Sequence, residues 1–316
     1  KQSKALYAQS QDYLQAVRTQ LIAGIANTYY TLLMLDQQLA ISRQTEETWR
    51  ETVASTRALM NAGMANESAV SQMEATYYQV QTSVLDLEEQ INQVENSLSL
   101  LLAETPHTIE RADTWNFPYG MQERFSVGIP VQMLSNRPDV RSAERSLEAA
   151  FYVTNQARSA FYPSIVLSGS AGWTNSAGAM IINPGKFLAS AVGSLTQPLF
   201  NRGQVVAQYR IARAQQEEAA LGFQQTLLNA GSEVNDALIA YQTSQGKRIL
   251  LDKQITSLQT ALRSTTLLME HGNTTYLEVL TSRQSLLSAQ LSQTANHFTE
   301  IQSLINLYRA LGGGQE

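Results

Sequence analysis

Apolar positions in residues 67–104 recur every three or four residues, the spacing that gives one face of an α-helix. The members of this seam are Val70, Met73, Tyr77, Val80, Val84, Leu87, Ile91, Val94, Leu98 and Leu101. The stretch from Lys1 to about Ala62 contains no proline and is rich in good helix formers. Helices of roughly 60 and 37 residues would be about 90 and 55 Å long. Residues 1–104 are therefore predicted to form an extended helical hairpin, too long for a compact core.

Residues 201–316 carry the same pattern. A proline-free stretch runs to His271, the pattern breaks at His-Gly-Asn, and a final helix is predicted to end near Leu311. The seam of this last helix is Leu280, Leu287, Leu291, Phe298, Ile301, Ile305 and Tyr308. Its members are also three or four residues apart if the polar Gln284 and Thr294 are counted as part of the seam. A second long helical hairpin follows.

The two hairpins superimpose without a gap at an offset of 209 residues, which is the separation of Gly63 from Gly272. Residues that match at this offset include Val70 with Val279, Gln81 with Gln290, Leu98 with Leu307 and Leu102 with Leu311. Matching breaks and matching seams at one offset indicate a tandem duplication of a long α-hairpin. Each hairpin needs neighbours for its apolar face, so two hairpins per chain and several chains could close a helical cylinder.

Residues 105–140 differ in composition, with four prolines and a cluster of aromatic residues, and predict an irregular segment. A shorter helix is expected from about Pro138 to Phe161, and it accounts for the segment 141–163. Pro163 is expected to stop it.

In residues 164–200 the period changes to two. Ser164–Thr174 and Phe187–Gln197 each alternate apolar with small, mostly polar residues, which predicts two strands of roughly ten residues. Their length, their alternation and Trp173 match a transmembrane β-hairpin. A soluble hairpin packed on the helices is the alternative, and the pattern alone favours it, because the signal of a membrane strand is weak.

Charge and composition exclude several classes of function. Lys and Arg total 22 against 27 Asp and Glu, a net charge of −5, so nucleic acid is not an expected partner. The chain has no cysteine, which removes disulfides, thiolate catalysis and Cys-based zinc sites. The three histidines, His107, His271 and His297, share no metal-ligand spacing. No apolar run reaches 18 residues, so no transmembrane helix is encoded. No metal site, cofactor or catalytic residue is assigned, and the chain is not predicted to be an enzyme.

Several short runs carry a family resemblance, and one of them is Leu21-Ile22-Ala23 with Ala26 and Tyr29-Tyr30. Residues 136–145 read Asn-Arg-Pro-Asp-Val-Arg-Ser-Ala-Glu-Arg, residues 157–165 continue this signature, and residues 197–203 and 308–314 add Gln-Pro-Leu-Phe-Asn-Arg-Gly and Tyr-Arg-Ala-Leu-Gly-Gly-Gly. Together they resemble the TolC-like outer-membrane factors, particularly the NodT-type lipoprotein branch. The resemblance extends over essentially the whole chain.

The resemblance implies a mainly α-helical fold with a membrane β segment. The duplicated hairpins of three chains would form a periplasmic tunnel, and their β-hairpins would contribute to a twelve-stranded barrel in the outer membrane. Each chain of the family supplies four strands, and only two are found here. Two strands, and the lipidated cysteine typical of this branch, are therefore expected before Lys1.

By the same resemblance, the protein is expected to be the exit duct of a tripartite efflux pump for drugs or other small toxic compounds. Its implied partners are two further copies of itself, a periplasmic adaptor (membrane fusion) protein, an inner-membrane pump of the RND type, and outer-membrane lipid. One alternative is the exit duct of a type I protein secretion system. Another is a soluble coiled-coil scaffold.

The resemblance also places the two hairpin turns at the periplasmic tip, where the channel narrows. Three copies of Glu278 near a threefold axis would make an acidic ring that favours cations. The alternative is a solvated glutamate favoured by the start of its helix. Ser68, near the first turn, is a second gate candidate, through a hydrogen bond to a neighbouring helix, or else a helix cap.

The remaining candidates concern docking and lipid. Gly63 and Gly272 are expected to reverse the chain at positive φ and, with Asn273, to contact the adaptor. Trp173 and Phe187 are candidates for the aromatic girdle at the membrane interface.

Overall fold

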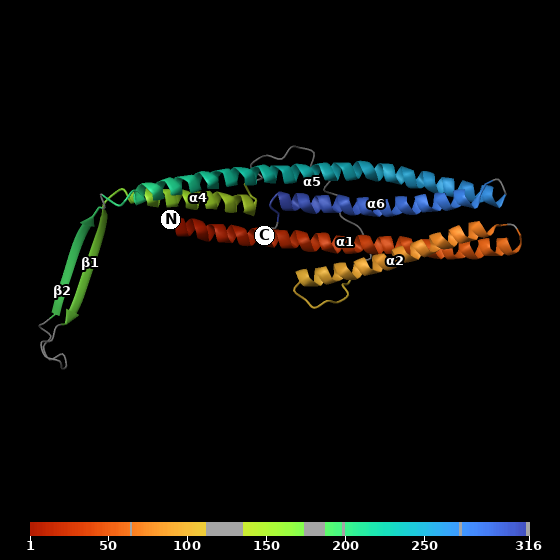
Figure 1. Ribbon diagram of the computed structural model, residues 1–316, viewed down its shortest axis with the longest axis horizontal. Coiled ribbons are helices and arrows are strands. Elements are labelled where there is room, and N and C mark those ends of the chain that lie inside the picture. Colours follow the sequence, from red (N-terminus) through yellow and green to blue (C-terminus); the bar gives the residue numbers. More distant parts are fainter. Residues whose placement is uncertain (64, 112–134, 174–186, 198–199, 272–273, 314–316) are drawn as a thin grey trace. The chain divides into compact units, whose positions relative to one another are not determined.

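The computed structural model describes residues 1–63, 65–111, 135–173, 187–197, 200–271 and 274–313 (Figure 1). The elements are α1 (Gln2–Asn61), α2 (Glu67–Leu101), α4 (Pro138–Ser159), β1 (Ser164–Trp173), β2 (Phe187–Thr196), α5 (Gln204–Glu270) and α6 (Tyr276–Ala310). Helices α1 and α5 have 60 and 67 residues. Such lengths correspond to about 90 and 100 Å. The chain divides into two units, Lys1–Tyr13 with Pro138–Leu228, and Leu14–Arg137 with Asn229–Glu316.

In the second unit, α1 and α2 form the first predicted hairpin, called hairpin one below (Figure 1). The predicted seam of α2 is the face that is buried: Val70, Met73, Val80, Val84, Ile91 and Leu98 are all less than a tenth exposed. Part of this seam packs with Leu32 and Leu35 of α1. The 3,4-spacing was therefore a correct guide to the packed face of α2.

Charged residues on the flanks of hairpin one connect its helices. Arg43 and Glu88 form an ion pair of 2.7 Å, and Arg57 pairs with Glu74 closer to the turn. Both arginine side chains are more than half exposed, so each pair contributes at most about 1 kcal/mol to stability. The apolar seam therefore supplies most of the stability of the hairpin.

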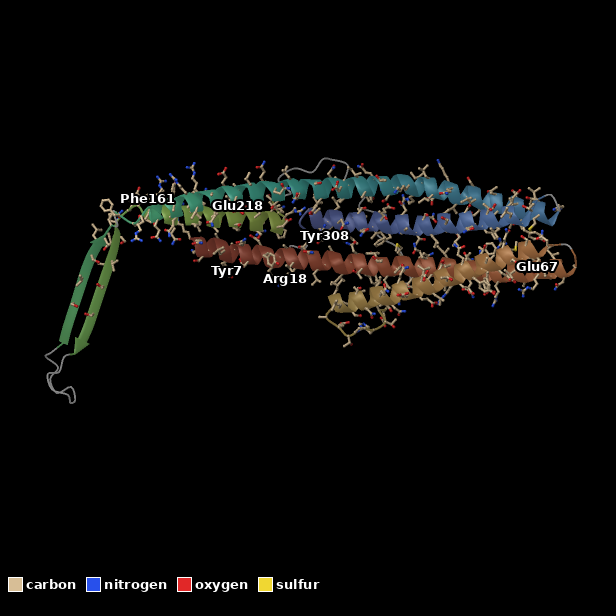
Figure 2. The ribbon with its side chains drawn as sticks, viewed as in Figure 1. Tyr7, Arg18, Glu67, Phe161, Glu218 and Tyr308 are labelled. Atoms are coloured by element: carbon tan, nitrogen blue, oxygen red, sulfur yellow. The ribbon has the colours of Figure 1, made fainter. Side chains whose placement is uncertain are left out.

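Helices α5 and α6 form the second predicted hairpin, called hairpin two below. Ile301 and Ile305 of α6 are buried as its seam predicts, but Tyr308, assigned to the same seam, is 51% exposed (Figure 2). Thr294, allowed as a polar member of the seam, is buried, and the buried face also includes Asn296, Glu300 and Ser303, which the seam did not contain. Ile301 and Ile305 pack with Ala23 of α1, so α6 also contacts hairpin one.

The described ends of the segment 105–140 are fixed by arginines. Arg111 lies 2.6 Å from Asp36 and 3.1 Å from Glu95, joining this segment to both helices of hairpin one. Arg137, which is 5% exposed, donates to the carbonyl of Ala310 at 3.1 Å. The segment therefore begins and ends in contacts with the long helices.

In the first unit, α4 packs beside the beginnings of α1 and α5. Arg141 of α4 forms an ion pair of 2.8 Å with Asp12, and the Thr154 hydroxyl donates to the carbonyl of Ala212 at 3.1 Å. Phe161, just beyond α4, contacts the ring of Tyr209 edge-on. The predicted helix from about Pro138 is confirmed, and it ends at Ser159.

Strands β1 and β2 pair antiparallel from Ser164 opposite Thr196 to Trp173 opposite Phe187. Ile165, Leu167 and Leu195 are 74%, 83% and 69% exposed, on the face opposite to the hydroxyls of Ser170 and Ser190. Those two hydroxyls are 2.8 Å apart. The predicted alternation is confirmed. An exposed apolar face is not the arrangement of a hairpin packed on helices.

Candidate functional site

The first hairpin turn follows the end of α1 and is built on Gly63. Its φ is +76°, and its N–H donates to the carbonyl of Met60 at 2.9 Å. A left-handed residue just beyond a helix C-terminus is the usual way to satisfy the last carbonyls, and glycine adopts that conformation without a steric cost. The predicted chain-reversing role of Gly63 is confirmed.

Helix α2 then begins on an N-cap that the sequence interpretation did not name. The side-chain oxygen of Asn66 accepts a hydrogen bond of 2.8 Å from the N–H of Ala69. Asn66 therefore fills the capping role considered for Ser68. Ser68 is exposed in the first turn of α2, next to the acidic Glu67, which lies at the same end of the hairpin (Figure 2).

At the second turn, Gly272 and Asn273 lie outside the described residues. The description resumes at Thr274, whose hydroxyl donates to the carboxylate of Glu278. Glu278 is exposed and is the third residue of α6, and its N–H donates to the carbonyl of Thr275 at 3.2 Å. The carboxylate therefore lies at the N-terminus of the helix, where the positive end of the dipole favours a negative charge. Thr274 orients it.

Trp49 of α1 is 1% exposed and forms, with Met73 and Val80 of α2, a core cluster near the turns. Tyr276, Leu280 and Leu287 of α6 pack against this cluster. One indole ring therefore joins α1, α2 and α6. It binds the beginning of α6, which carries Glu278, to hairpin one.

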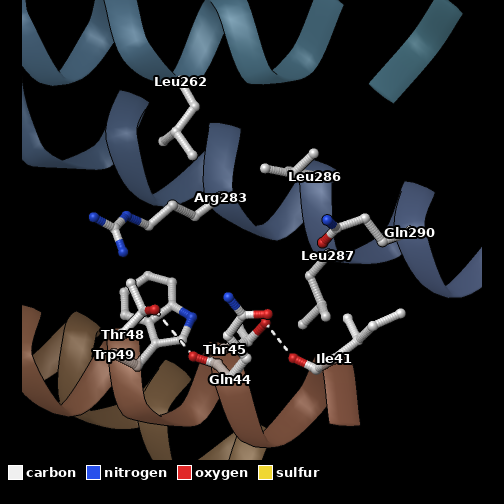
Figure 3. Close-up of a pocket in the computed structure, with 10 residues that line it drawn as sticks. All are labelled: Ile41, Gln44, Thr45, Thr48, Trp49, Leu262, Arg283, Leu286, Leu287 and Gln290. Atoms are coloured by element: carbon white, nitrogen blue, oxygen red, sulfur yellow. Dashed lines mark hydrogen bonds between the residues drawn. The ribbon is translucent and has the colours of Figure 1, made fainter. Parts of the chain in front are cut away.

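A pocket of about 190 Å³ lies beside Trp49 (Figure 3). Arg283 of α6 enters it, with its guanidinium carbon 6.0 Å from the centre of the Trp49 ring. The hydroxyls of Thr45 and Thr48 donate back to the carbonyls of Ile41 and Gln44, at 2.8 and 3.0 Å (Figure 3). Gln44 and Gln290 also line the pocket. The wall is therefore mixed, apolar at the indole and polar around it.

Burial lowers the pKa of Arg283, and the nearby charge of Glu51 opposes this shift. The Nε atom of Arg283 is buried, and no hydrogen-bond partner is found for it among the described residues. The position that matches Arg283 at the repeat offset is Glu74, which is paired with Arg57 in hairpin one. The two turns therefore differ in charge at equivalent positions.

Trp173 and Phe187 are a cross-strand pair at the end of β1 and the start of β2. Their side chains lie outside what the structure describes, so the structure supports only their pairing. In the described part of the chain, no helix combines the length and the apolar composition needed to cross a bilayer.

No group of three His, Asp or Glu side chains that could hold a metal ion is found among these same residues.

Residues 1–104 and 129–313 match the family described as outer membrane efflux protein. The chain belongs to this family. It is 28% identical over 308 residues to the cation efflux system protein CusC of Escherichia coli O6:H1, covering 98% of this chain and 67% of that protein. It is 30% identical over 312 residues to the solvent efflux pump outer membrane protein SrpC of Pseudomonas putida, covering 98% of this chain and 65% of that one.

The fold agrees. The crystal structure of the outer membrane protein VceC of Vibrio cholerae superimposes with a TM-score of 0.92 at 25% identity, covering all of this chain and 75% of VceC. The chain thus spans about two thirds to three quarters of the length of these relatives. The outer membrane efflux proteins are a family of channels rather than of enzymes, and the protein is an outer-membrane efflux channel.

The sequence interpretation assigned no role to three residues at or near the turns: Asn66, Thr274 and Trp49. Asn66 and Thr274 stand just before helices that contain an acidic first turn, a signal that was available in the sequence. Trp49 has no such signal, because its burial depends on contacts with α6, far along the chain.

Proposed function

We propose that the protein works as the homotrimeric exit duct of a tripartite efflux pump, with its gate at the two hairpin turns. The observation that carries the gate is Glu278, exposed at the start of α6 and held there by Thr274. Membership of the outer membrane efflux family supports the duct. The energy for transport comes from the pump.

The gate acts through charge. Three copies of Glu278 around a threefold axis make an acidic ring, which attracts cations and repels anions at the narrow end of the duct. The helix N-terminus beneath each carboxylate favours its ionised form. Ser68 adds a hydroxyl beside the first turn, available for a hydrogen bond to a neighbouring helix.

The adaptor docks on the turns themselves. Gly63, Gly272 and Asn273 provide small residues there, so the backbone of a partner helix is able to approach closely. The inner-membrane pump that the adaptor connects to this duct is of the RND type.

The β-hairpin contacts outer-membrane lipid. Its exposed apolar face, which includes Ile165, Leu167 and Leu195, would be costly in water and is suited to acyl chains. Trp173 and Phe187, paired at the far end of the strands from Ser164, lie at the level of the lipid headgroups.

The cargo is a small toxic ion or organic compound. The relatives described above are named for the efflux of cations and of solvents, and a wide duct binds either only weakly. Selectivity by charge at the Glu278 ring distinguishes cationic from anionic cargo.

Planar-bilayer conductance of the whole gene product tests both parts of this proposal. We expect discrete openings that prefer cations, and a fall of about twofold or more in the cation-to-anion permeability ratio in Glu278→Gln. Glu67→Gln, an acidic residue in the first turn of the equivalent helix, is the matched control. Unchanged selectivity in Glu278→Gln would remove this residue from the gate and leave the duct. A reconstituted protein without openings, alone or with its adaptor, would contradict the duct.

A further inference from the structure

The two hairpins are duplicates, yet their buried layers have opposite chemistry. In hairpin one, the apolar layer consists of Leu32, Leu35 and Leu39 of α1 and Leu87, Ile91 and Val94 of α2. The residues 209 positions later are Tyr241, Ser244 and Arg248 of α5 and Asn296, Glu300 and Ser303 of α6. These six form the polar layer of hairpin two. The change of chemistry therefore affects both helices of the pair, position by position.

The polar layer is buried. Ser244, Glu300 and Ser303 are 2%, 4% and 4% exposed, and Tyr241 and Asn296 are less than a tenth exposed. Arg248 is the exception, with a third of its side chain in contact with solvent. These polar groups therefore occupy, in hairpin two, the positions that form the apolar core in hairpin one.

Two contacts join members of the polar layer across α5 and α6. The Asn296 amide donates to the carbonyl of Ser244 at 2.9 Å, and Arg248 Nη1 lies 3.6 Å from Glu300 Oε1. Burial raises the pKa of the Tyr241 hydroxyl, and the charge of Glu300 raises it further. Ser244 and Ser303 donate their hydroxyls to carbonyls of their own helices, so the contacts of Asn296 with Ser244 and of Arg248 with Glu300 are the ones that depend on the other helix.

Duplicated helices carry a risk of exchange. Because the seams of α2 and α6 follow the same spacing at one offset, α5 could pair with α2, or α1 with α6, in the same register. An apolar layer alone would not discriminate, since one set of leucines packs about as well against another. A polar layer does discriminate, because a buried charge needs its own partner.

We propose that the polar layer is a pairing code, by which α5 and α6 select each other over the equivalent helices of hairpin one. If α5 paired with α2, Arg248 would face Leu87, Ile91 and Val94. If α6 replaced α2 on the leucine face of α1, Glu300 would be buried among Leu32, Leu35 and Leu39 without a cation. Both exchanged pairs separate Arg248 from Glu300, whereas the native pair keeps the two charges 3.6 Å apart, so the code acts on both exchanges at once.

Paired cysteines report which helices have paired, because this chain has no cysteine of its own. Asp252 and Gln293 are hydrogen-bonded across α5 and α6 at 2.6 Å, so D252C with Q293C reports the native pair. Asp252 matches Arg43 at the repeat offset, and Arg43 contacts Glu88 in hairpin one. D252C with E88C therefore reports α5 paired with α2. R43C with E88C is the control for hairpin one.

The first variant converts the polar layer to the residues of hairpin one, as Y241L/S244L/R248L/N296L/E300I/S303V. It is expressed as the whole protein in its membrane and oxidised, and cross-links within one chain are separated from those between chains by size. The measured quantity is the yield of the intrachain D252C–E88C cross-link divided by that of the D252C–Q293C cross-link. We expect this ratio to be at least about tenfold higher in the variant than in the protein with the unaltered polar layer. A folded variant that keeps the ratio of the unaltered layer would overturn the proposal.

A second set of variants tests the pairing code if the apolar variant aggregates. R248E places a second carboxylate beside Glu300, and R248E/E300R restores a complementary pair with the charges exchanged. We expect R248E to raise the exchanged cross-link several-fold, and the double variant to return it to within about twofold of the unaltered layer. Equal ratios in the single and double variants would show that complementarity does not set the pairing.

Discussion

Arg137 and Glu233 are 96 residues apart in the sequence and form an ion pair of 2.9 Å. The same guanidinium donates to the carbonyl of Ala310, at the end of α6. One nearly buried side chain thus connects the segment before α4 to the middle of α5 and the C-terminus of α6. The Cβ of an alanine at position 312 would lie 3.1 Å from the carbonyl of Asn136, so the chain after α6 runs tightly past this arginine.

Arg137→Ala is therefore expected to lower the free energy of unfolding by about 2–3 kcal/mol, because two charge-assisted hydrogen bonds are lost. Arg137→Lys is expected to lose less, since a lysine keeps the charge but not the forked geometry. Urea titration at a fixed protein concentration measures both. Arg50→Lys, in an exposed ion pair with Glu47, is the control and is expected to change stability by less than about 0.5 kcal/mol.

Gly63 and Gly246 should respond in opposite directions to the same substitution. At Gly63 the φ of +76° makes alanine strained, although nothing lies within 4 Å of its Cβ, and Gly63→Ala is expected to cost about 1–2 kcal/mol. Gly246 lies inside α5, also with open space, so Gly246→Ala is expected to stabilise by up to about 1 kcal/mol. Equal effects of the two substitutions on the urea midpoint would contradict a conformational role for Gly63.

The long helices, the turn at Gly63 and the strand pairing were predictable, because each depends on local patterns of period or on one residue type. The seam of α2 is the clearest case, since its buried members are apolar and evenly spaced. The face of α6 was not predictable in the same way. Asn296 and Glu300 look like solvent positions in a helix, and only their partners on α5 make their burial tolerable.

Trp49 and Arg283 show the same limit at the candidate site. Neither residue belongs to a motif, and their contact depends on how hairpin one packs against α6. Glu278 was singled out by the family resemblance, which places this turn at the narrow periplasmic tip, and not by a pattern of its own. Its hydrogen bond with Thr274 is local and could have been expected.

Asp36 should give the protein a pH-dependent stability. Burial raises the pKa of its carboxyl, the charge and hydrogen bond of Arg111 lower it, and Glu95 raises it, with burial the largest effect. Because the folded state then binds this proton more tightly than the unfolded state, the contribution of Asp36 to stability grows as the pH falls through the raised folded pKa towards the usual value near 3.9.

Urea unfolding of the original protein and Asp36→Asn between about pH 7 and pH 4 measures this contribution. We expect the stability of the original protein, relative to Asp36→Asn, to increase as the pH falls. Arg111→Met is expected to steepen the change, because it removes the group that lowers the Asp36 pKa. Parallel pH profiles for the three proteins would contradict the effect of burial.

The contact of Trp49 with Arg283 predicts a measurable coupling between hairpin one and α6. Trp49→Ala empties a site that is 1% exposed and is expected to cost about 3–5 kcal/mol. A double-mutant cycle with Trp49→Leu and Arg283→Met isolates the ring–guanidinium term, which is expected to be about 0.5–1 kcal/mol. Leucine and methionine keep apolar volume in the core, so the cycle removes the interaction without removing the packing. Strictly additive effects of the two substitutions would mean that Arg283 fills the pocket beside Trp49 without being attracted to the ring.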